Sequence, residues 1–377
     1  MKILTVFGTR PEAIKMCPLL KVLQQREEID SIVCVTAQHR EMLDQILHVF
    51  QIIPDYDLNI MREQQTLTSI TIDILNGMEA IIQKEEPDLV LVHGDTATSF
   101  VTALAAFYQK VPVGHVEAGL RSFSKYSPFP EEMNRCLTAR IAELHFAPTE
   151  QNRRNLEQEG ITEHVFVTGN TVIDSFKTTI QHTYKYSEDN LNRIYHSEGR
   201  IILVTAHRRE NWGRPLRNIC HAIKKIVDEF TDVQIVYPVH YNPVVRNCVY
   251  EILGGKRRIN LFNPIDVVDM HNAINNSYLI LSDSGGIQEE ASTLGIPVVL
   301  LRKETERMEA VNAGVIIKAG IEEDNIVECT RKLLSSPDYY QSVAVKTCLY
   351  GSGDSSQQIV NHIWDWNLER IRREGRL

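Results

Sequence analysis

The sequence predicts an α/β protein with two Rossmann-like, doubly wound parallel sheets that face each other across a cleft. Short apolar and β-branched runs alternate with helical stretches along the whole chain. These runs are continuously apolar, as expected for strands that are covered by helices on both faces. They fall into two groups, separated by a polar segment at 174–200, and 377 residues suffice for two domains of ordinary size.

The predicted strands follow the chain in order. The first group comprises 3–7, 32–36, 89–93, 113–117, 144–147 and 165–168. The second group comprises 201–205, 233–238, 259–262, 278–282, 298–301 and 315–318. We interpret 174–200 as a helix and connector that span a domain boundary near residue 172. The predicted domains are therefore 1–171 and 172–354, with a last helix at 355–377 that packs back on the first.

The last helix follows a turn-forming Gly351-Ser352-Gly353 segment. Small polar residues suited to cap its start come next, namely Asp354, Ser355 and Ser356. Apolar residues then recur at helical spacing, namely Ile359, Ile363 and Trp366. We expect one face of this helix to be buried.

Composition excludes several classes of protein. The net charge is −9 and no dense basic block occurs, which argues against a nucleic-acid surface. No apolar run is long enough to predict a membrane span. The seven cysteines are scattered and form no Cys-x-x-Cys pair, which is typical of reduced thiols in a cytoplasm. The first residues, 1–7, are too few for a signal peptide and predict a strand.

A nucleotide site is predicted where the apolar run 278–282 leads into Asp283-Ser284-Gly285-Gly286. Glycines let the backbone approach an anion, and the free N–H groups of a helix N-terminus point at it. Glu290 lies less than two turns into this helix, where its carboxylate could accept from ribose hydroxyls. The alternative is an ordinary Ser/Gly helix start.

The other candidate residues also stand near predicted strand ends, where doubly wound sheets bind ligands. Arg10 and Lys15 follow the first strand and would bring positive charge for a diphosphate to a second helix N-terminus. The alternative is that both are solvated surface residues.

Three acids and two histidines occupy similar positions. Asp95 follows 89–93 and either acts in chemistry or caps the next helix. Glu117 lies in an apolar neighbourhood, where Arg121 could pair with it. Glu131 starts a helix and could simply complement its dipole. His207 and His240 end strands of the second half. Several carboxylates in one cleft are typical of proton transfer.

Some motifs are absent from the sequence. There is no Gly-x-Gly-x-x-Gly, which argues against a dinucleotide redox cofactor, and no Gly-x-x-x-x-Gly-Lys-Ser/Thr. No cluster has obvious metal-ligand spacing. We therefore predict neither a cofactor nor a metal.

Taken together, the motifs resemble those of the non-hydrolysing UDP-N-acetylglucosamine 2-epimerases, in order and over nearly the whole chain. They are Gly8-Thr9-Arg10-Pro11-Glu12, His93-Gly94-Asp95-Thr96, His115-Val116-Glu117-Ala118-Gly119-Leu120-Arg121, Pro130-Glu131-Glu132-Met133-Asn134-Arg135, Ala206-His207-Arg208-Arg209-Glu210-Asn211 and Asp283-Ser284-Gly285-Gly286-Ile287-Gln288-Glu289-Glu290. The resemblance implies the two-domain arrangement of GT-B glycosyltransferases, a last helix that crosses back to the first domain, and a homodimer.

The reaction that the resemblance implies converts UDP-GlcNAc into UDP-ManNAc and back without NAD. UDP leaves by anti elimination to give 2-acetamidoglucal, and then adds back with C2 inverted. The product would serve cell-surface polysaccharide synthesis. Such a site needs acids and bases around C2, donors for the diphosphate and exclusion of water.

The resemblance also implies roles for particular residues. The acid/base and electrostatic group is expected to be Asp95, Glu117 and Glu131, with His207 assisting at the sugar or the leaving phosphate. The UDP-sugar is expected to be bound by Arg10, Lys15, Arg135, Ser284, Gly285, Gly286, Glu290 and Arg307.

The sequence departs from the family pattern at three positions. Met270 stands where relatives often carry Phe against uracil, and a thioether can still pack on a ring. Some bacterial relatives bind a second UDP-GlcNAc as an activator, a pattern that fits Gln38, His39, Arg40, Arg208 and His240. Glu41 and Gln64 stand where Gln and Arg are expected, which disfavours a second diphosphate.

Other functions stay open at this point. A hydrolysing relative would release ManNAc and UDP, and another relative would act on a diacetamido-uronic acid nucleotide. A GT-B glycosyltransferase would share the UDP site without needing the three acids. A non-catalytic UDP-sugar sensor would have no use for them.

Overall fold

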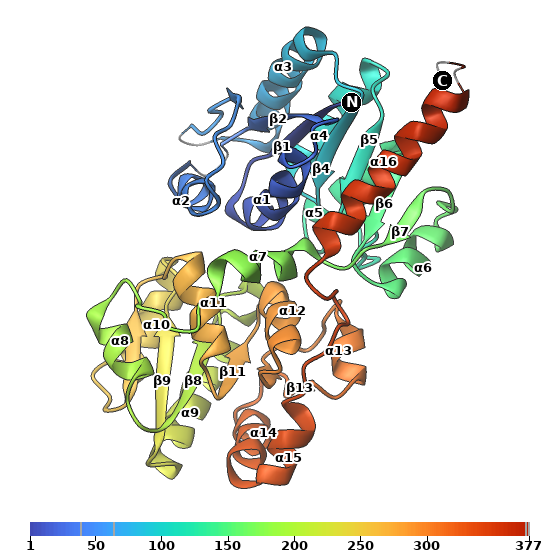
Figure 1. Ribbon diagram of the computed structural model, residues 1–377. Helices are drawn as coiled ribbons and strands as arrows, with labels where there is room; N and C mark the ends of the chain where they lie inside the picture. Colours follow the sequence, from blue (N-terminus) through green and yellow to red (C-terminus); the bar gives the residue numbers. More distant parts are fainter. Residues whose placement is uncertain (38–39, 63–64, 374, 376–377) are drawn as a thin grey trace. The chain divides into compact units, whose positions relative to one another are not determined.

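The computed structural model describes residues 1–37, 40–62, 65–373 and 375. The chain divides into two compact units, Met1–Thr178 with Tyr350–Leu377 and Thr179–Leu349, each with its own sheet (Figure 1). The boundary predicted near residue 172 lies within helix α7, Thr171–Thr179, most of which belongs to the first unit.

The sheet of the first unit is parallel, with strand order β3-β2-β1-β4-β5-β6-β7. Its strands are β1 (Lys2–Phe7), β2 (Asp30–Val35), β3 (Tyr56–Asp57), β4 (Leu89–His93), β5 (Val113–Val116), β6 (Leu144–Ala147) and β7 (Val165–Val167). Strand order reverses between β1 and β4, which is the switch point where doubly wound sheets bind ligands. The predicted strands are confirmed to within two residues, whereas the two-residue edge strand β3 was missed.

Helices cover both faces of this sheet. One group is formed by α1, which packs against α2 and α16, and the other by α4, which packs against α3 and α5. The helices of the first unit are α1 (Arg10–Gln24), α2 (Arg40–Phe50), α3 (Leu67–Glu85), α4 (Ala97–Tyr108), α5 (Glu131–Ile141), α6 (Glu150–Gln158), α7 and α16 (Ser355–Arg373).

The second unit repeats the same topology. Its parallel sheet has the order β10-β9-β8-β11-β12-β13, with the switch point between β8 and β11. The strands are β8 (Arg200–Thr205), β9 (Val233–Pro238), β10 (Ile259–Phe262), β11 (Leu279–Ser282), β12 (Val298–Leu300) and β13 (Ile316–Lys318). The helices are α8 (Asp189–Tyr195), the 3-10 helix η1 (Arg209–Asn211), α9 (Arg214–Glu229), α10 (Pro243–Leu253), α11 (Val267–Asn275), α12 (Gly285–Leu294), α13 (Met308–Asn312), α14 (Glu323–Ser335) and α15 (Pro337–Val343).

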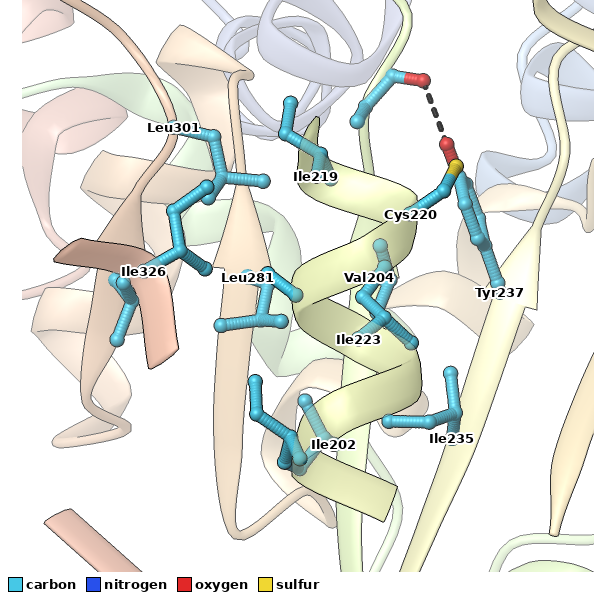
Figure 2. Close-up of a cluster of buried hydrophobic side chains, with 14 of the residues drawn as sticks. Ile202, Val204, Ile219, Cys220, Ile223, Ile235, Tyr237, Leu281, Leu301 and Ile326 are labelled. Atoms are coloured by element: carbon cyan, nitrogen blue, oxygen red, sulfur yellow. Dashed lines mark hydrogen bonds between the residues drawn. The ribbon is translucent and has the colours of Figure 1, made fainter. Parts of the chain in front are cut away.

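The core of the second unit lies between its sheet and helices α9 and α14 (Figure 2). Ile219 and Ile223 of α9 are fully buried, as are Ile202 and Leu281 of the central strands. Each such side chain contributes about 1.5–3 kcal/mol by leaving water, so packing rather than helix propensity fixes α9 on the sheet. Tyr237 is also buried, and its hydroxyl donates to the carbonyl of Ala206 at 2.8 Å.

Helix α16 returns to the first unit, as predicted. Its apolar stripe, Ile359, Ile363 and Trp366, is buried. The capping prediction is corrected in part, because the carboxylate of Asp174 accepts the backbone N–H groups of Ser355 and Ser356, at 3.2 and 2.8 Å. None of the helices in the described part of the chain combines the length and apolar character that a membrane span requires.

Candidate active site

Glu117 lies at the carboxyl end of β5, where Lys15, Asn170 and His93 lie close to its carboxylate. Its Oε1 accepts from Lys15 Nζ at 2.5 Å and from Asn170 Nδ2 at 2.9 Å. Its Oε2 lies 3.3 Å from His93 Nε2. Glu117 also has a φ of 62°, a left-handed conformation that costs an ordinary residue about 1–3 kcal/mol and that is concentrated at functional sites. These contacts stabilise the carboxylate form of Glu117.

His93 reaches Glu117 as a neutral imidazole. Burial lowers the pKa of His93 to about 4, although the charge of Glu117 opposes this shift. His93 therefore lies beside Glu117 as a neutral ring rather than as a cation, with its Nε2 3.3 Å from Oε2 of the carboxylate.

Asp95 follows β4, and its environment raises its pKa, whereas the contacts of Glu117 stabilise the carboxylate form. Burial raises the pKa of Asp95, Arg135 lowers it, and the neighbouring charges of Glu117 and Glu131 raise it again. The Nη2 of Arg135 lies 2.6 Å from Oδ2 of Asp95. Because burial raises its pKa, Asp95 binds a proton more readily than an exposed aspartate does, which suits a residue that delivers a proton. It does not cap α4, since that role belongs to Thr96, whose hydroxyl accepts from Ser99 N.

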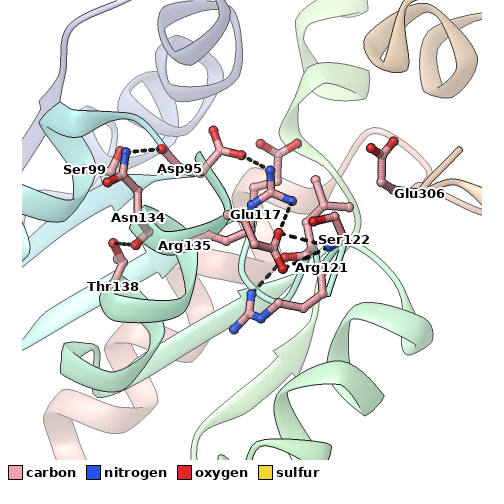
Figure 3. Close-up of polar contacts among 12 residues, drawn as sticks. Asp95, Ser99, Glu117, Arg121, Ser122, Asn134, Arg135, Thr138 and Glu306 are labelled. Atoms are coloured by element: carbon pink, nitrogen blue, oxygen red, sulfur yellow. Dashed lines mark hydrogen bonds and ion pairs between the residues drawn. The ribbon is translucent and has the colours of Figure 1, made fainter. Parts of the chain in front are cut away.

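Helix α5 supports Asp95 through several polar contacts (Figure 3). Asn134 Nδ2 donates to the carbonyl of Asp95 at 2.9 Å, and Arg135 also lies 3.5 Å from Glu132. Glu132 in turn accepts from the backbone N–H groups of Ser122 and Phe123, at 3.0 and 2.9 Å. The helix therefore ties the Asp95 turn to the loop that precedes α5.

The turns after β1 and β4 are joined by Glu12, which is buried. Its Oε2 accepts from the backbone N–H groups of Gly8 and Thr9, at 3.1 and 2.8 Å, and its Oε1 accepts from the hydroxyl of Thr96 at 2.7 Å. Burial raises the pKa of Glu12, and these donors oppose the shift. Glu12 thereby fixes the backbone on either side of Arg10 and Asp95.

Buried Asp283 organises the corresponding end of the second sheet. Its Oδ2 accepts from the backbone N–H groups of His207 and Arg208 and from Asn211 Nδ2, each at 2.9 Å. His207 Nδ1 lies 3.6 Å from Oδ1 of Asp283. The His207 ring also stacks on His240, with centroids 5.4 Å apart. Burial lowers the pKa of His207, Asp283 opposes this, and His240 and Arg208 reinforce it.

Helix α12 begins at Gly285 directly after this turn, and Arg307 lies over its N-terminus. A Cβ added at Gly285 would lie 2.7 Å from Nη1 of Arg307, so a larger residue here would displace the guanidinium from its present position. Arg307 Nε donates to Glu289 at 2.7 Å, which orients the group. A guanidinium beside the free N–H groups of a helix start is an arrangement suited to phosphate.

Further positive charge lies nearby on Arg208 and Arg302. Burial lowers the pKa of Arg208, and the charges of Arg302 and Arg307 lower it further. Glu306 partly balances this cluster. Burial raises the pKa of Glu306, but Arg302, 3.1 Å away, overcomes that effect and lowers the pKa to about 2. An anion that reached this cluster would relieve its repulsion.

Glu290 lies on α12 one turn past the glycines. A Cβ at Gly286 would be 3.4 Å from its Oε1, and His271 Nε2 lies 4.0 Å from its Oε2. His271 is oriented by a 2.7 Å hydrogen bond between its Nδ1 and the hydroxyl of Thr179. Met270 on α11 is half-buried.

The structure groups the sequence-predicted residues by unit. The first unit carries Arg10, Lys15, Asp95, Glu117, Glu131 and Arg135, and the second carries His207, Arg208, His240, Ser284, Gly285, Gly286, Glu290 and Arg307. Gln38 and His39 of the predicted activator site, and the departure at Gln64, lie outside the described residues.

One pairing predicted from the sequence is wrong. Arg121 does not pair with Glu117. Its Nε and Nη2 bind Glu159 Oε1 and Oε2 at 2.7 and 2.8 Å.

Sequence reasoning missed the supporting residues His93, Asn170 and Asp283. His93 and Asp283 were quoted within motifs, and their position at strand ends was the available signal. Asn170 had no such signal, because its contact with Glu117 spans 53 residues of sequence.

Comparisons with known proteins support a single family. A family model described as UDP-N-acetylglucosamine 2-epimerase matches residues 21–364. The chain is 52% identical to a Bacillus subtilis UDP-N-acetylglucosamine 2-epimerase and 49% identical to one from Escherichia coli K12. These alignments cover 96% of this chain and 95% and 97% of the relatives.

Solved structures agree with that match. A Neisseria meningitidis UDP-GlcNAc 2-epimerase bound to UDP-GlcNAc has a TM-score of 0.90 at 45% identity, covering 97% of this chain and 100% of that one. The S. aureus MnaA–UDP structure has a TM-score of 0.89 at 49% identity, covering 97% of each chain.

Proposed function

Because the chain belongs to the UDP-N-acetylglucosamine 2-epimerase family, we propose that it interconverts UDP-GlcNAc and UDP-ManNAc by elimination and re-addition of UDP. The observation that carries the proposal is the contrast between two acids on adjacent strands. Asp95 has a raised pKa, whereas Glu117 is held by Lys15, Asn170 and His93. Two carboxyl groups in contrasting environments are the equipment for moving protons in both directions.

The chemistry requires such a pair. The C2 proton of UDP-GlcNAc is poorly acidic, so its removal must accompany cleavage of the C1–O bond. A base takes the proton, the C1–C2 double bond forms, and UDP leaves with the electron pair of the C1–O bond. A proton then adds to C2 on the opposite face while UDP returns to C1. Epimerisation needs a proton donor and a proton acceptor at C2.

We assign Asp95, Glu117 and Glu131 to this acid/base and electrostatic group. His207 assists at the sugar or at the leaving phosphate, since its ring is partly exposed and held beside Asp283. Donors that meet developing negative charge on the diphosphate would lower the barrier to its departure.

We assign binding of the UDP moiety to the start of α12. Ser284, Gly285, Gly286 and Arg307 would hold phosphate, and Glu290 the ribose. Arg10, Lys15 and Arg135 stay in the proposed binding set, although Lys15 and Arg135 contact Glu117 and Asp95 in the present structure.

The biological setting is part of the proposal. We propose a cytoplasmic homodimer that supplies precursors for cell-surface polysaccharide. The second UDP-GlcNAc site would include Arg208 and His240, which both belong to the second unit. Activation there would give a lag or upward curvature in rate at low UDP-GlcNAc concentration, and its absence would leave linear kinetics.

The test is product analysis with purified protein and UDP-GlcNAc, without added NAD or metal, by chromatography of nucleotides and sugars. UDP-ManNAc with little free sugar is the expected result. Free ManNAc and UDP would instead identify a hydrolysing enzyme. No reaction with UDP-GlcNAc, but transfer of its sugar to an acceptor, would identify a glycosyltransferase.

A further inference from the structure

We propose that Asn170 is a positioning residue that holds Glu117 for catalysis and connects it to the places where the chain leaves and re-enters the first unit. The inference rests on the proposed function. Lys15 and His93, the other described neighbours of Glu117, belong to the β1–β5 region, whereas Asn170 lies outside it, just after β7. Lys15 and His93 belong to the motifs at the ends of β1 and β4, whereas Asn170 belongs to neither motif. A role for Asn170 is therefore a separate inference.

The Asn170 amide has one available orientation. The backbone N–H of Val172 donates to Oδ1 of Asn170 at 3.0 Å, so that atom must be the oxygen. The NH₂ group then points at Glu117 and donates to Oε1 at 2.9 Å. A donor fixed in this way favours the charged form of Glu117 and holds the carboxylate in one place.

The backbone of Asn170 is fixed by the returning chain. Its N–H donates to the carbonyl of Tyr350 at 2.7 Å. At the preceding Gly169, which has a φ of 81°, a Cβ would lie 2.5 Å from the hydroxyl of Ser355 and 2.8 Å from Cα of Gly351. The segment that enters α16 therefore packs directly on the segment that carries Asn170, as Figure 1 shows for the start of α16 beside α7.

The chain passes from the first unit to the second after Thr178 and returns after Leu349, close to these two segments. Asp174 joins them a second time through the N-terminus of α16. If a change at either crossing moved Tyr350 relative to Asn170, the Asn170 side chain would shift with it. The hydrogen bond between Asn170 and Glu117 would then change. Asn170 is thus placed to make the strength of the Glu117 contact depend on the state of the crossings.

The test compares Asn170→Ala and Asn170→Asp with wild type and with a matched control. The control is Asn367→Ala, which removes a buried amide on α16 of the same unit. The measurements are kcat and kcat/KM for epimerisation from pH 5 to 9, affinity for UDP, and thermal unfolding. The titratable groups that the contacts place around Glu117 are Lys15, His93 and Asp95, which all three variants retain.

Loss of one hydrogen bond to a charged group should reduce the kcat of Asn170→Ala by about tenfold to a hundredfold. The acid limb of its kcat/KM profile should move to higher pH. Asn170→Asp places a second carboxylate beside Glu117 and should move that limb further. Affinity for UDP should stay within about twofold, and Asn367→Ala should behave as wild type in kcat and pH profile.

Two results would overturn the inference while wild type produces UDP-ManNAc. One is an Asn170→Ala enzyme with unchanged kcat and pH profile. The other is loss of activity that is matched by loss of UDP affinity and thermal stability, with the pH profile unchanged, since that pattern marks a structural role. A wild-type protein that forms no UDP-ManNAc would instead overturn the proposed function, and this inference with it.

Discussion

Single residues at the end of the first sheet show how one site can keep two acids in contrasting states. Asp95 is half-buried beside Arg135, and desolvation outweighs the arginine's charge, so the pKa of Asp95 is raised. Glu117 accepts from Lys15 at 2.5 Å and from Asn170 at 2.9 Å, and His93 lies 3.3 Å away. The sequence named both acids and Lys15, but not which would contact which, because side-chain pairing depends on backbone angles that residue types alone do not determine.

Replacing either acid by its amide should separate catalysis from binding. In Asp95→Asn and Glu117→Gln, we expect kcat to fall by about 10²- to 10⁴-fold, the range for loss of a general acid or base. Affinity for UDP should change little, because both variants keep the positive charges of Lys15 and Arg135 and the proposed contacts at the start of α12. Steady-state kinetics and calorimetric titration with UDP would measure the two quantities.

The control for these variants is Asp232→Asn, which removes an exposed partner of Arg200. An exposed pair contributes about 0–1 kcal/mol, so this enzyme should retain full activity. Near-normal turnover by both active-site variants would remove Asp95 and Glu117 from the mechanism.

At the scale of elements, the start of α12 was predictable and its arginine was not. An apolar run ending in Ser284-Gly285-Gly286 predicts a strand, a turn and a helix N-terminus from sequence alone, and the structure confirms them. Arg307 was placed at UDP only by family resemblance. Its position over Gly285 depends on the β12–α13 connection, whose path no local pattern specifies.

Gly285→Ala should weaken UDP binding without disturbing the helix. The new Cβ would lie 2.7 Å from the Arg307 guanidinium, which must move away from the helix N-terminus. Loss of one charge-assisted contact predicts about a 10- to 100-fold weaker affinity for UDP. Alanine is the better helix former, so thermal stability should not fall by much. Unchanged affinity would show that Arg307 does not bind phosphate.

Buried histidines on three neighbouring strands predict a sensitivity to acid. Burial lowers the pKa of His93 to about 4, of His115 to about 3 and of His145 to about 4. The unfolded chain takes up these protons near pH 6.5, before the folded protein does. The free energy of unfolding should therefore be highest above pH 6.5 and should fall toward pH 4. Toward pH 4, Glu12 has the opposite effect on the free energy of unfolding, because its pKa is raised in the folded protein.

The variant His145→Gln tests this prediction away from the acids. It should reduce the slope of unfolding free energy against pH by about one proton, or about 1.4 kcal/mol per pH unit. Urea unfolding followed by the fluorescence of Trp366, with Trp212 and Trp364 replaced by Phe, would report on the first unit. His48→Gln, at an exposed histidine of α2, is the control, and an equal change in both variants would contradict the assignment.

At the scale of the molecule, the sequence predicted two doubly wound units and the return of the last helix. Repeated apolar runs and the stripe on α16 carried that prediction, because both patterns are local. The edge strand β3 was missed because two residues form no pattern. The links from Asn170 to Tyr350 and from Asp174 to Ser356 were missed because each joins residues far apart in sequence.

The two units carry different proposed groups. The acids proposed to act at C2 belong to the first unit, and the diphosphate contacts proposed at the start of α12 belong to the second. If protons leave one face of C2 and arrive on the other, the hydrogen in the product must come from the solvent. That consequence separates proton transfer from any route that returns the original hydrogen to C2.

The most direct measurement is proton NMR of the wild-type reaction with UDP-GlcNAc in D₂O. The account predicts UDP-ManNAc that carries deuterium at C2, with little free sugar. UDP-ManNAc that retains its original hydrogen at C2 would contradict proton exchange by these carboxylates, and with it the central claim.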